Sequence, residues 1–142
     1  MPLAMLTGRG EQTIVKGVGL NPIPDDKVFL LYARDLESSE EKALLASEVR
    51  YHPNILDFEI PKTPLYVHLD TDVINPKYAP AQRYLAPGGP SVKELSGLFK
   101  RFSNSGQVVA ISLSAWYPDL DTDGKTRESS MKLLGDLISQ CN

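Results

Sequence analysis

Residues 66–76, YVHLDTDVINP, combine a short apolar strand pattern with three polar side chains. Aromatic and β-branched residues that are stopped by Asn-Pro predict a β-strand. Because successive strand side chains alternate between the two faces, His68, Asp70 and Asp72 are expected to project from the same face. An imidazole and two carboxylates lined up on an otherwise apolar strand mark this stretch as the candidate functional site.

Strand patterns recur along the chain on either side of this stretch. The predicted strands are residues 28–33, 56–60, 65–70 and 108–114. The first, third and fourth are nearly continuous in apolar residues, a pattern typical of strands that are buried on both faces. Residues 7–27, rich in Gly and Pro, are predicted to be a loop.

Helix signals lie between and after the strands. A capping-box pattern starts at Ser38 and another at Ser91, and Thr126 is in a position to cap a third helix. Alternation of strands and helices predicts an α/β fold with a mainly parallel sheet and helices on both faces. Neither a repeat nor a linker divides the sequence, so residues 1–142 are predicted to form a single domain.

Composition limits the classes of partner. The 142 residues are 42% hydrophobic and 23% charged, and the net charge is −3 without a basic stripe. A globular domain with a small-molecule partner fits these values better than binding to nucleic acid or to a membrane. The single cysteine, Cys141, cannot form an intrachain disulfide, and the longest apolar run is too short to span a bilayer. We therefore expect a cytoplasmic protein.

Asp70 and Asp72 follow the strand at its carboxyl end, where open parallel sheets bind their ligands. Two closely spaced carboxylates repel each other unless a cation neutralises them, so one interpretation makes both aspartates ligands of a divalent metal. The alternative is a pair of solvated aspartates that cap the following turn. His68, deeper in the strand, is either a further ligand or a hydrogen-bonded histidine behind the ligands.

Residues 68–91, HLDTDVINPKYAPAQRYLAPGGPS, resemble the arginase, agmatinase and formiminoglutamase (ureohydrolase) family. The hallmark of that family is a strand that reads Asp-x-Asp-x-x-Asp-Pro, followed by an Ala-Pro loop and a Pro-Gly-Gly turn before a helix. Weaker similarities cover MPLAMLTG near the start of the chain, VFLLYARDLESSEE and VVAISLSAWYPDLD. The chain is similar to the C-terminal half of the family domain only.

The resemblance implies an incomplete three-layer α/β/α fold and a site for two manganese ions. In such a site Asp70 would bridge the two ions and Asp72 would hold one of them. The implied reaction is hydrolysis of a carbon–nitrogen bond in a linear amidine or a related substrate by metal-activated hydroxide.

Several positions depart from the family pattern. The metal-binding histidine and the Asp-Ala-His-x-Asp strand of the family's first half have no counterpart. Ala115 stands where arginases carry the glutamate that binds the guanidinium, so the substrate is expected not to be arginine. Asn75 replaces the third aspartate of the hallmark and is a candidate for supporting the ligands. Gln82, Arg83 and Tyr84 replace the Gly-Thr-Gly-Thr loop and are candidate substrate contacts, although Arg83 can also be read as a solvated surface residue.

These departures leave two readings open. One is a manganese-dependent hydrolase that is inactive as an isolated chain and associates with a second copy, or with a partner chain that supplies the missing half. The other is a non-catalytic remnant or interaction module of the same fold.

Three further patterns are weighed against these readings. Residues 119–124, DLDTDG, match the opening of a calcium loop, but Ser130 stands at the closing glutamate position, which favours a solvated loop at a helix N-terminus. An Asp-x-Asp strand end also occurs in haloacid-dehalogenase-like phosphatases, whose lysine and later carboxylates find no match here. Trp116 and Tyr117 either form an aromatic wall over a ligand or pack against the sheet.

Overall fold

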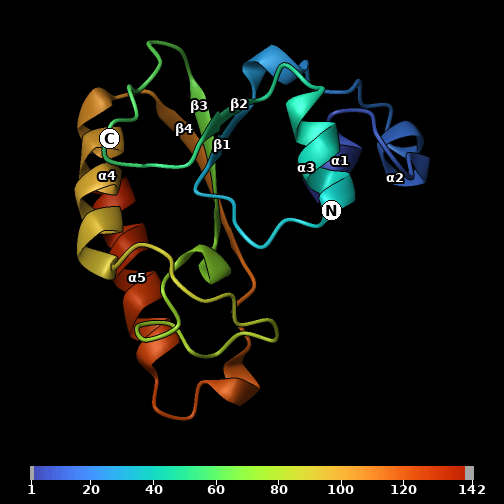
Figure 1. Cartoon of the computed structure of the whole chain (residues 1–142). Coiled ribbons are helices and arrows are strands. Elements are labelled where there is room, and N and C mark those ends of the chain that lie inside the picture. Colours follow the sequence, from blue (N-terminus) through green and yellow to red (C-terminus); the bar gives the residue numbers. More distant parts are fainter. Residues whose placement is uncertain (1, 140–142) are drawn as a thin grey trace. The chain divides into compact units, whose positions relative to one another are not determined.

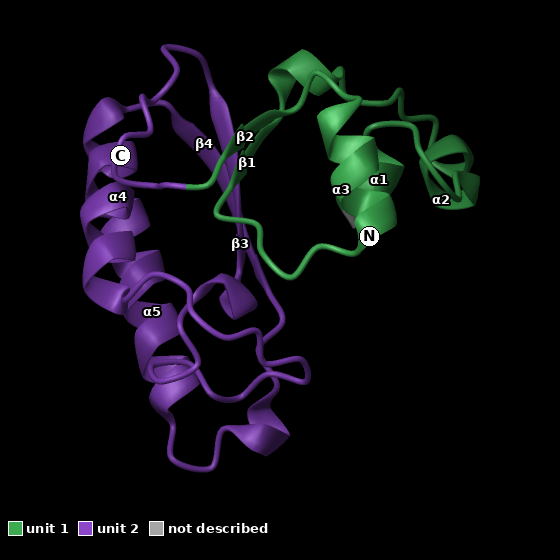
Figure 2. Cartoon of the chain, in the orientation of Figure 1, with its two compact units in different colours: residues 1–53 green, residues 54–142 purple. Residues whose placement is uncertain are grey.

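The computed structural model describes residues 2–139 of the chain. The chain divides into two compact units, residues 1–53 and residues 54–142 (Figure 2). Each unit contains its own pair of parallel strands, which confirms the α/β class. The single-domain interpretation of residues 1–142 stays a prediction, and Cys141 lies outside the described residues.

The first unit holds two parallel strands and three short α-helices. In chain order its elements are α1 (Pro2–Leu6), α2 (Thr13–Gly17), the 3-10 helix η1 (Asp25–Lys27), β1 (Phe29–Leu31), α3 (Ser38–Leu45) and β2 (Arg50–His52). In β1 and β2, Phe29 lies opposite Arg50 and Leu31 lies opposite His52. The prediction that residues 7–27 are a loop is therefore wrong, since α2 and η1 fall within them.

Local backbone geometry explains two further differences in this unit. The strand predicted over residues 28–33 stops at Leu31 because Tyr32 adopts a left-handed conformation, with φ at 55°. Helix α3 begins at Ser38, and its N-cap is Glu37 rather than Ser38. The Glu40 carboxylate accepts the backbone N–H of Glu37 at 2.9 Å, so the capping box lies one residue earlier than predicted.

The second unit carries the candidate site on a β-α-β arrangement. Its elements are β3 (Leu65–Asp70), the 3-10 helix η2 (Thr71–Val73), α4 (Val92–Ser105), β4 (Val108–Ser114), the 3-10 helix η3 (Pro118–Leu120) and α5 (Lys125–Ile138). Strands β3 and β4 are parallel, with Asp70 opposite Ser114. Helices α4 and α5 run side by side along one face of this pair (Figure 1).

The core of the second unit lies between these helices and the sheet. Apolar side chains on α4 recur at intervals of three and four residues and meet the buried side chains of α5. The buried apolar residues are Leu95, Leu98, Phe99 and Phe102 on α4 and Leu133 and Leu137 on α5. Full burial of such a side chain stabilises the fold by about 2 kcal/mol, so these contacts hold α4 and α5 together beside β4.

The strand predicted over residues 56–60 is irregular. Phe58 is buried and its ring lies 5.8 Å from that of Phe102, so this segment contributes to the core although it was not among the strands predicted to be buried. The backbone carbonyls of Leu56 and Phe58, however, accept hydrogen bonds from the Arg101 guanidinium. Because a side chain satisfies these groups, no strand ladder is needed there.

The expectation that the apolar strands are buried on both faces is wrong for β3 and β4. On β3, Tyr66 and His68 are exposed whereas Leu69 is buried, and on β4 Val109 is 70% exposed. The cause is that α4 and α5 cover one face only. Among residues 2–139, no helix is long and apolar enough to cross a membrane.

Candidate functional site

Asp70 is the last residue of β3, and Asp72 lies beyond the strand in η2. The prediction that Asp72 shares a strand face with His68 and Asp70 is therefore wrong. The chain turns at Thr71, and Asp70 Oδ1 accepts the backbone N–H of Asp72 at 3.2 Å. This hydrogen bond closes an Asx-type turn that places both aspartates at the carboxyl end of the strand. Asp70 is half-buried and Asp72 is exposed.

The turn that carries the aspartates is anchored by Gln82. Thr71 is fully buried, and its carbonyl accepts the Gln82 side-chain N–H at 2.8 Å. Gln82 is only 5% exposed, so this candidate substrate contact lies beneath the turn rather than in solvent. Its amide ties the segment after Asn75 to the segment that presents Asp70 and Asp72.

His68 belongs to a hydrogen-bonded network across β3 and β4. Its Nδ1 lies 2.6 Å from Ser112 Oγ, and its Nε2 lies 3.2 Å from Ser114 Oγ. Tyr66 Oη adds a further contact of 2.5 Å to Ser112 Oγ. The two serines were missed by sequence reasoning. Their alternation in ISLS was visible, but only the register of the two strands shows that they face His68.

Asn75 shapes the turn that follows the aspartates. Its Oδ1 accepts the backbone N–H of Lys77 at 3.0 Å, and its own N–H donates to the carbonyl of Pro90 at 3.0 Å. The side chain thus closes an Asx turn, a role that Asp and Asn share. This geometry explains how Asn replaces the third aspartate of the hallmark without loss of the turn.

The loop that contains Gln82 is also held by the start of α5. The backbone N–H of Ala81 donates to Thr126 Oγ1 at 2.9 Å, and the carbonyl of Ala81 accepts the N–H of Tyr117 at 3.2 Å. Thr126 is fully buried and does not cap α5, so the predicted capping role is wrong. The threonine hydroxyl accepts a hydrogen bond from the loop instead.

Asp121 organises the N-terminal end of α5. One carboxylate oxygen accepts the N–H of Thr126 at 3.0 Å, and the other accepts the N–H of Arg127 at 2.7 Å and the Trp116 indole N–H at 3.0 Å. Both carboxylate oxygens of Asp121 are thus occupied by protein donors. This observation favours a loop at a helix N-terminus, and not a calcium site, for residues 119–124. The same contact ties Trp116 to this loop.

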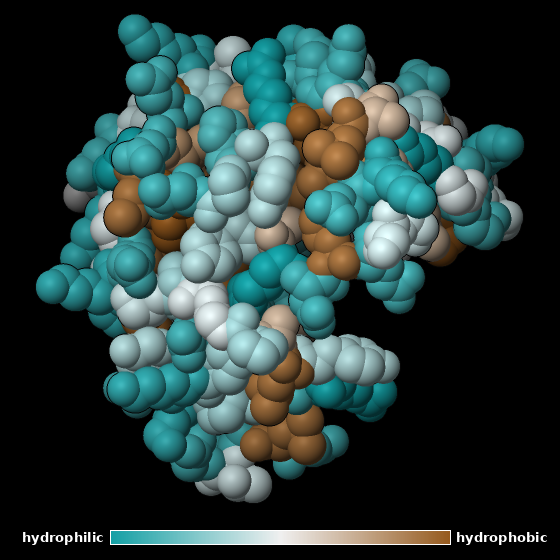
Figure 3. Space-filling view, in the orientation of Figure 1, coloured by the Kyte–Doolittle hydropathy of each residue, from teal (hydrophilic) through white to brown (hydrophobic). Residues whose placement is uncertain are grey.

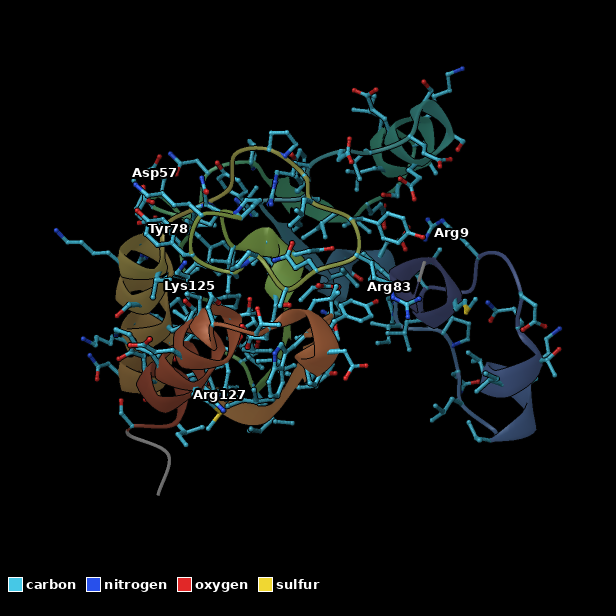
Figure 4. The ribbon with its side chains drawn as sticks, turned by 90° about the horizontal axis from the view of Figure 1, so that it is seen from below. Arg9, Asp57, Tyr78, Arg83, Lys125 and Arg127 are labelled. Atoms are coloured by element: carbon cyan, nitrogen blue, oxygen red, sulfur yellow. The ribbon has the colours of Figure 1, made fainter. Side chains whose placement is uncertain are left out.

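Arg83 and Tyr84 reach solvent from the same loop. Tyr84 is 84% exposed, and the Arg83 guanidinium carbon lies 5.0 Å from the centre of the Tyr117 ring. Figure 4 shows Arg83 well apart from Lys125 and Arg127, the other labelled cationic side chains of this unit. Figure 3 shows apolar side chains gathered at the loop-bearing end of the unit, whose loops expose Leu85 and Leu120.

The residues at this site suit a divalent metal by type but not by number. Carboxylate oxygens are ligands that Mn²⁺ prefers, and Asp70 and Asp72 provide them at one strand end. Within residues 2–139, however, no group of three or more His, Cys, Asp or Glu side chains is arranged to hold a metal. These two carboxylates therefore make at most part of a metal centre.

The sequence pattern of the arginase family matches residues 36–139 of this chain. The chain belongs to the arginase family. Members of this family are manganese-dependent hydrolases that act on carbon–nitrogen bonds. Arginase from Brucella melitensis biotype 1 is 28% identical over 134 residues, which cover 84% of this chain and 44% of the relative.

Solved structures agree on the arginase-like fold. An arginase from Bacillus subtilis superimposes with a TM-score of 0.85 at 23% identity, over 97% of this chain and 52% of the other. Formimidoylglutamase from Bacillus subtilis gives a TM-score of 0.72 at 18% identity, over 84% of this chain and 43% of the other. The chain thus spans about half the length of the arginases that it matches, which confirms an incomplete arginase fold.

Proposed function

We propose that this arginase-family chain contributes Asp70 and Asp72 to a manganese centre that hydrolyses a carbon–nitrogen bond in a linear amidine or a related substrate. The observation that carries the proposal is the Asx-type turn at the end of β3, which presents two carboxylates where parallel sheets bind ligands. Two ions are expected in the complete centre, and Asp70 and Asp72 would be among the residues that hold them. Bound metal would supply hydroxide near neutral pH.

The chain's own residues prepare this centre. Gln82 fixes the Thr71 carbonyl, so the turn between the aspartates is held from beneath. His68 is oriented by contacts of both ring nitrogens with serines, and it supports the end of the strand. Asn75 closes the turn at the start of the loop that carries Arg83. Since fixed ligands lose less conformational freedom on binding, this support favours metal at Asp70 and Asp72.

Arginine is not the expected substrate. Ala115 follows β4 with φ at 62° and carries no group that pairs with a guanidinium. We infer that the loop of Arg83 and Tyr84 recognises the substrate in place of the residue at position 115. The alternative is a non-catalytic member of the fold, and the exposed sheet face and the incomplete donor set are the observations that favour it.

Assembly is part of the proposal. Among the described residues, β3 and β4 pair only with each other, so each leaves an outer edge without a strand partner. Exposed strand edges readily pair with further strands. We propose that a second copy, or a polypeptide that carries the remaining ligands, covers these edges, and that the protein acts in the cytoplasm.

A chimera tests the proposed manganese centre. Residues 2–139 would replace the matching half of the Bacillus subtilis arginase, whose other half is retained. We expect the folded chimera to retain about two manganese ions by metal analysis, and Asp72→Asn to lower that number. Asp57→Asn is the matched control, because Asp57 is exposed and its hydrogen bond from Asn54 survives the change. A folded chimera that retains manganese equally well with Asp72→Asn would contradict the proposal.

A further inference from the structure

Arg83 is an exposed cation with an oriented guanidinium and, among the residues that the structure describes, no carboxylate partner. None of the ion pairs found among residues 2–139 involves it, whereas Lys125 pairs with Asp123 and Lys132 with Asp136. Its guanidinium lies over the Tyr117 ring at 5.0 Å. Stacking of this kind holds the plane of the guanidinium while its N–H groups stay available at the edge.

The position of Arg83 places it beside the candidate metal ligands. Gln82, the preceding residue, contacts the carbonyl of Thr71, which lies between Asp70 and Asp72. Tyr117 follows β4 at the same carboxyl edge, because Ser114 pairs with Asp70 in parallel strands. Both links place the loop of Arg83 at the end of the sheet that carries the aspartate turn.

We propose that Arg83 binds a carboxylate of the substrate, so that the substrate class is a linear amidine, or related carbon–nitrogen compound, whose far end is a carboxylate. The proposal rests on the proposed function for the position of the reacting end. Arginine presents donors in a planar fork that matches the two oxygens of a carboxylate. Tyr84 and Leu85, the next two residues of the loop, are exposed and would offer apolar contact to the carbon chain between the two ends.

The charges around the loop fit this assignment. The substrate's reacting end would approach two carboxylates and metal, and the other end would meet the single guanidinium of the loop. A substrate with a cationic far end would instead place like charges together, which lowers its affinity. The site therefore discriminates by the sign of the group at the far end.

The test compares two ligands that differ at one group. 4-Guanidinobutanoate carries a carboxylate where n-butylguanidinium carries a methyl group. Each is titrated into the chain at near-physiological salt, with chelator present, and the Nε–Hε signals of Arg83 and Arg127 are followed by NMR. We expect a saturable shift at Arg83 with the acid, an affinity about 5-fold above that of the alkyl compound, which corresponds to about 1 kcal/mol, and no saturable shift at Arg127.

Variants assign the effect to the guanidinium. Arg83→Gln should abolish the difference between the two ligands, and Arg83→Lys should keep only part of it because the ammonium lacks the planar fork. Arg127→Gln, the same change of charge at an exposed residue of α5, should leave the difference intact. Equal affinities for the two ligands, or an undiminished difference in Arg83→Gln, would overturn the proposal. Because this titration contains no metal, such a result would overturn the role of Arg83 only. The role of Asp70 and Asp72 is tested separately by manganese binding.

Discussion

At the scale of single residues, carboxylates in this chain act mainly through specific hydrogen bonds. Sequence reasoning identified Asp70 and Asp72 as a pair but put Asp72 on the strand, because strand periodicity does not reveal a turn at Thr71. It missed Ser112 and Ser114 since their meeting with His68 depends on the register between strands. Residues that act across elements are therefore the part of the site that a single sequence reveals least.

Asp121 is expected to be the most important of these carboxylates for stability. Asp121→Ala removes the acceptor for two backbone N–H groups and for the Trp116 indole. We expect a loss of about 2 kcal/mol in the free energy of unfolding, measured with urea at pH 7. Asp119→Ala, at an exposed neighbouring position, should change it by less than about 0.5 kcal/mol. Similar losses in the two variants would show that the three contacts do not stabilise the helix start.

Asp136 should make stability depend on pH. Burial raises the pKa of this carboxyl, but the hydrogen bonds from Lys132 and Ser96 and the charges of Lys132 and Lys100 outweigh it, so the pKa lies below its usual value. A lowered folded-state pKa gives stability that is present above the unfolded-state value of 3.8 and is lost as pH falls through the folded-state value.

Asp136→Asn tests this dependence. The carboxylate is 13% exposed and lies 2.8 Å from the Lys132 ammonium. We expect the variant to lose about 1 kcal/mol of unfolding free energy at pH 7 and much less in acid, at a pH where wild-type Asp136 is protonated. Urea titrations at the two pH values measure the difference. A loss that is the same in acid would mean that charge is not the cause.

At the scale of elements, the sequence predicted those whose signals are local. The bounds of β3 and β4 agree with prediction, and α4 begins after Ser91 as its capping box indicated. The strand predicted over residues 56–60 does not form, because the Arg101 guanidinium, more than forty residues away, donates to the carbonyls of this segment. The prediction that Thr126 caps α5 was wrong. N–H groups in the first turn of this helix donate to Asp121, which lies outside the usual spacing of a capping residue.

The N-cap of α4 offers a test at this scale. Ser91 Oγ accepts the N–H of Glu94 at 3.2 Å, and the Glu94 carboxylate accepts the N–H of Ser91 at 2.7 Å. Ser91→Ala should lower the free energy of unfolding by about 1 kcal/mol, because a backbone donor at the helix start loses its partner. Ser91→Asp, which keeps an acceptor, should recover most of the loss in the same urea titration. An equal loss in both variants would contradict a capping role.

At the scale of the whole molecule, the decisive facts are family membership and length. The chain belongs to the arginase family and spans about half the length of the arginases it matches. Alternation of strands and helices predicted the α/β class, and the resemblance of residues 68–91 to the family implied the incomplete arginase fold. Association was predicted as well, and light scattering after size-exclusion chromatography should show a mass above that of the 15.7 kDa chain. A constant monomer mass across a wide concentration range would contradict it.

Manganese affinity is the central claim at this scale, and it concerns Asp70. Two carboxylates alone should bind Mn²⁺ with a Kd of about 1 mM, which corresponds to a binding free energy of roughly −4 kcal/mol. A ligand that binds only the folded state raises its melting temperature, and the effect is lost when a metal-binding side chain is removed.

The most direct measurement is a set of four thermal melts: wild type and Asp70→Asn, each with excess manganese and with chelator. We expect manganese to raise the melting temperature of wild type and to leave that of Asp70→Asn unchanged. The same manganese response in both proteins, including no response in either, would contradict the assignment of Asp70 as a metal ligand.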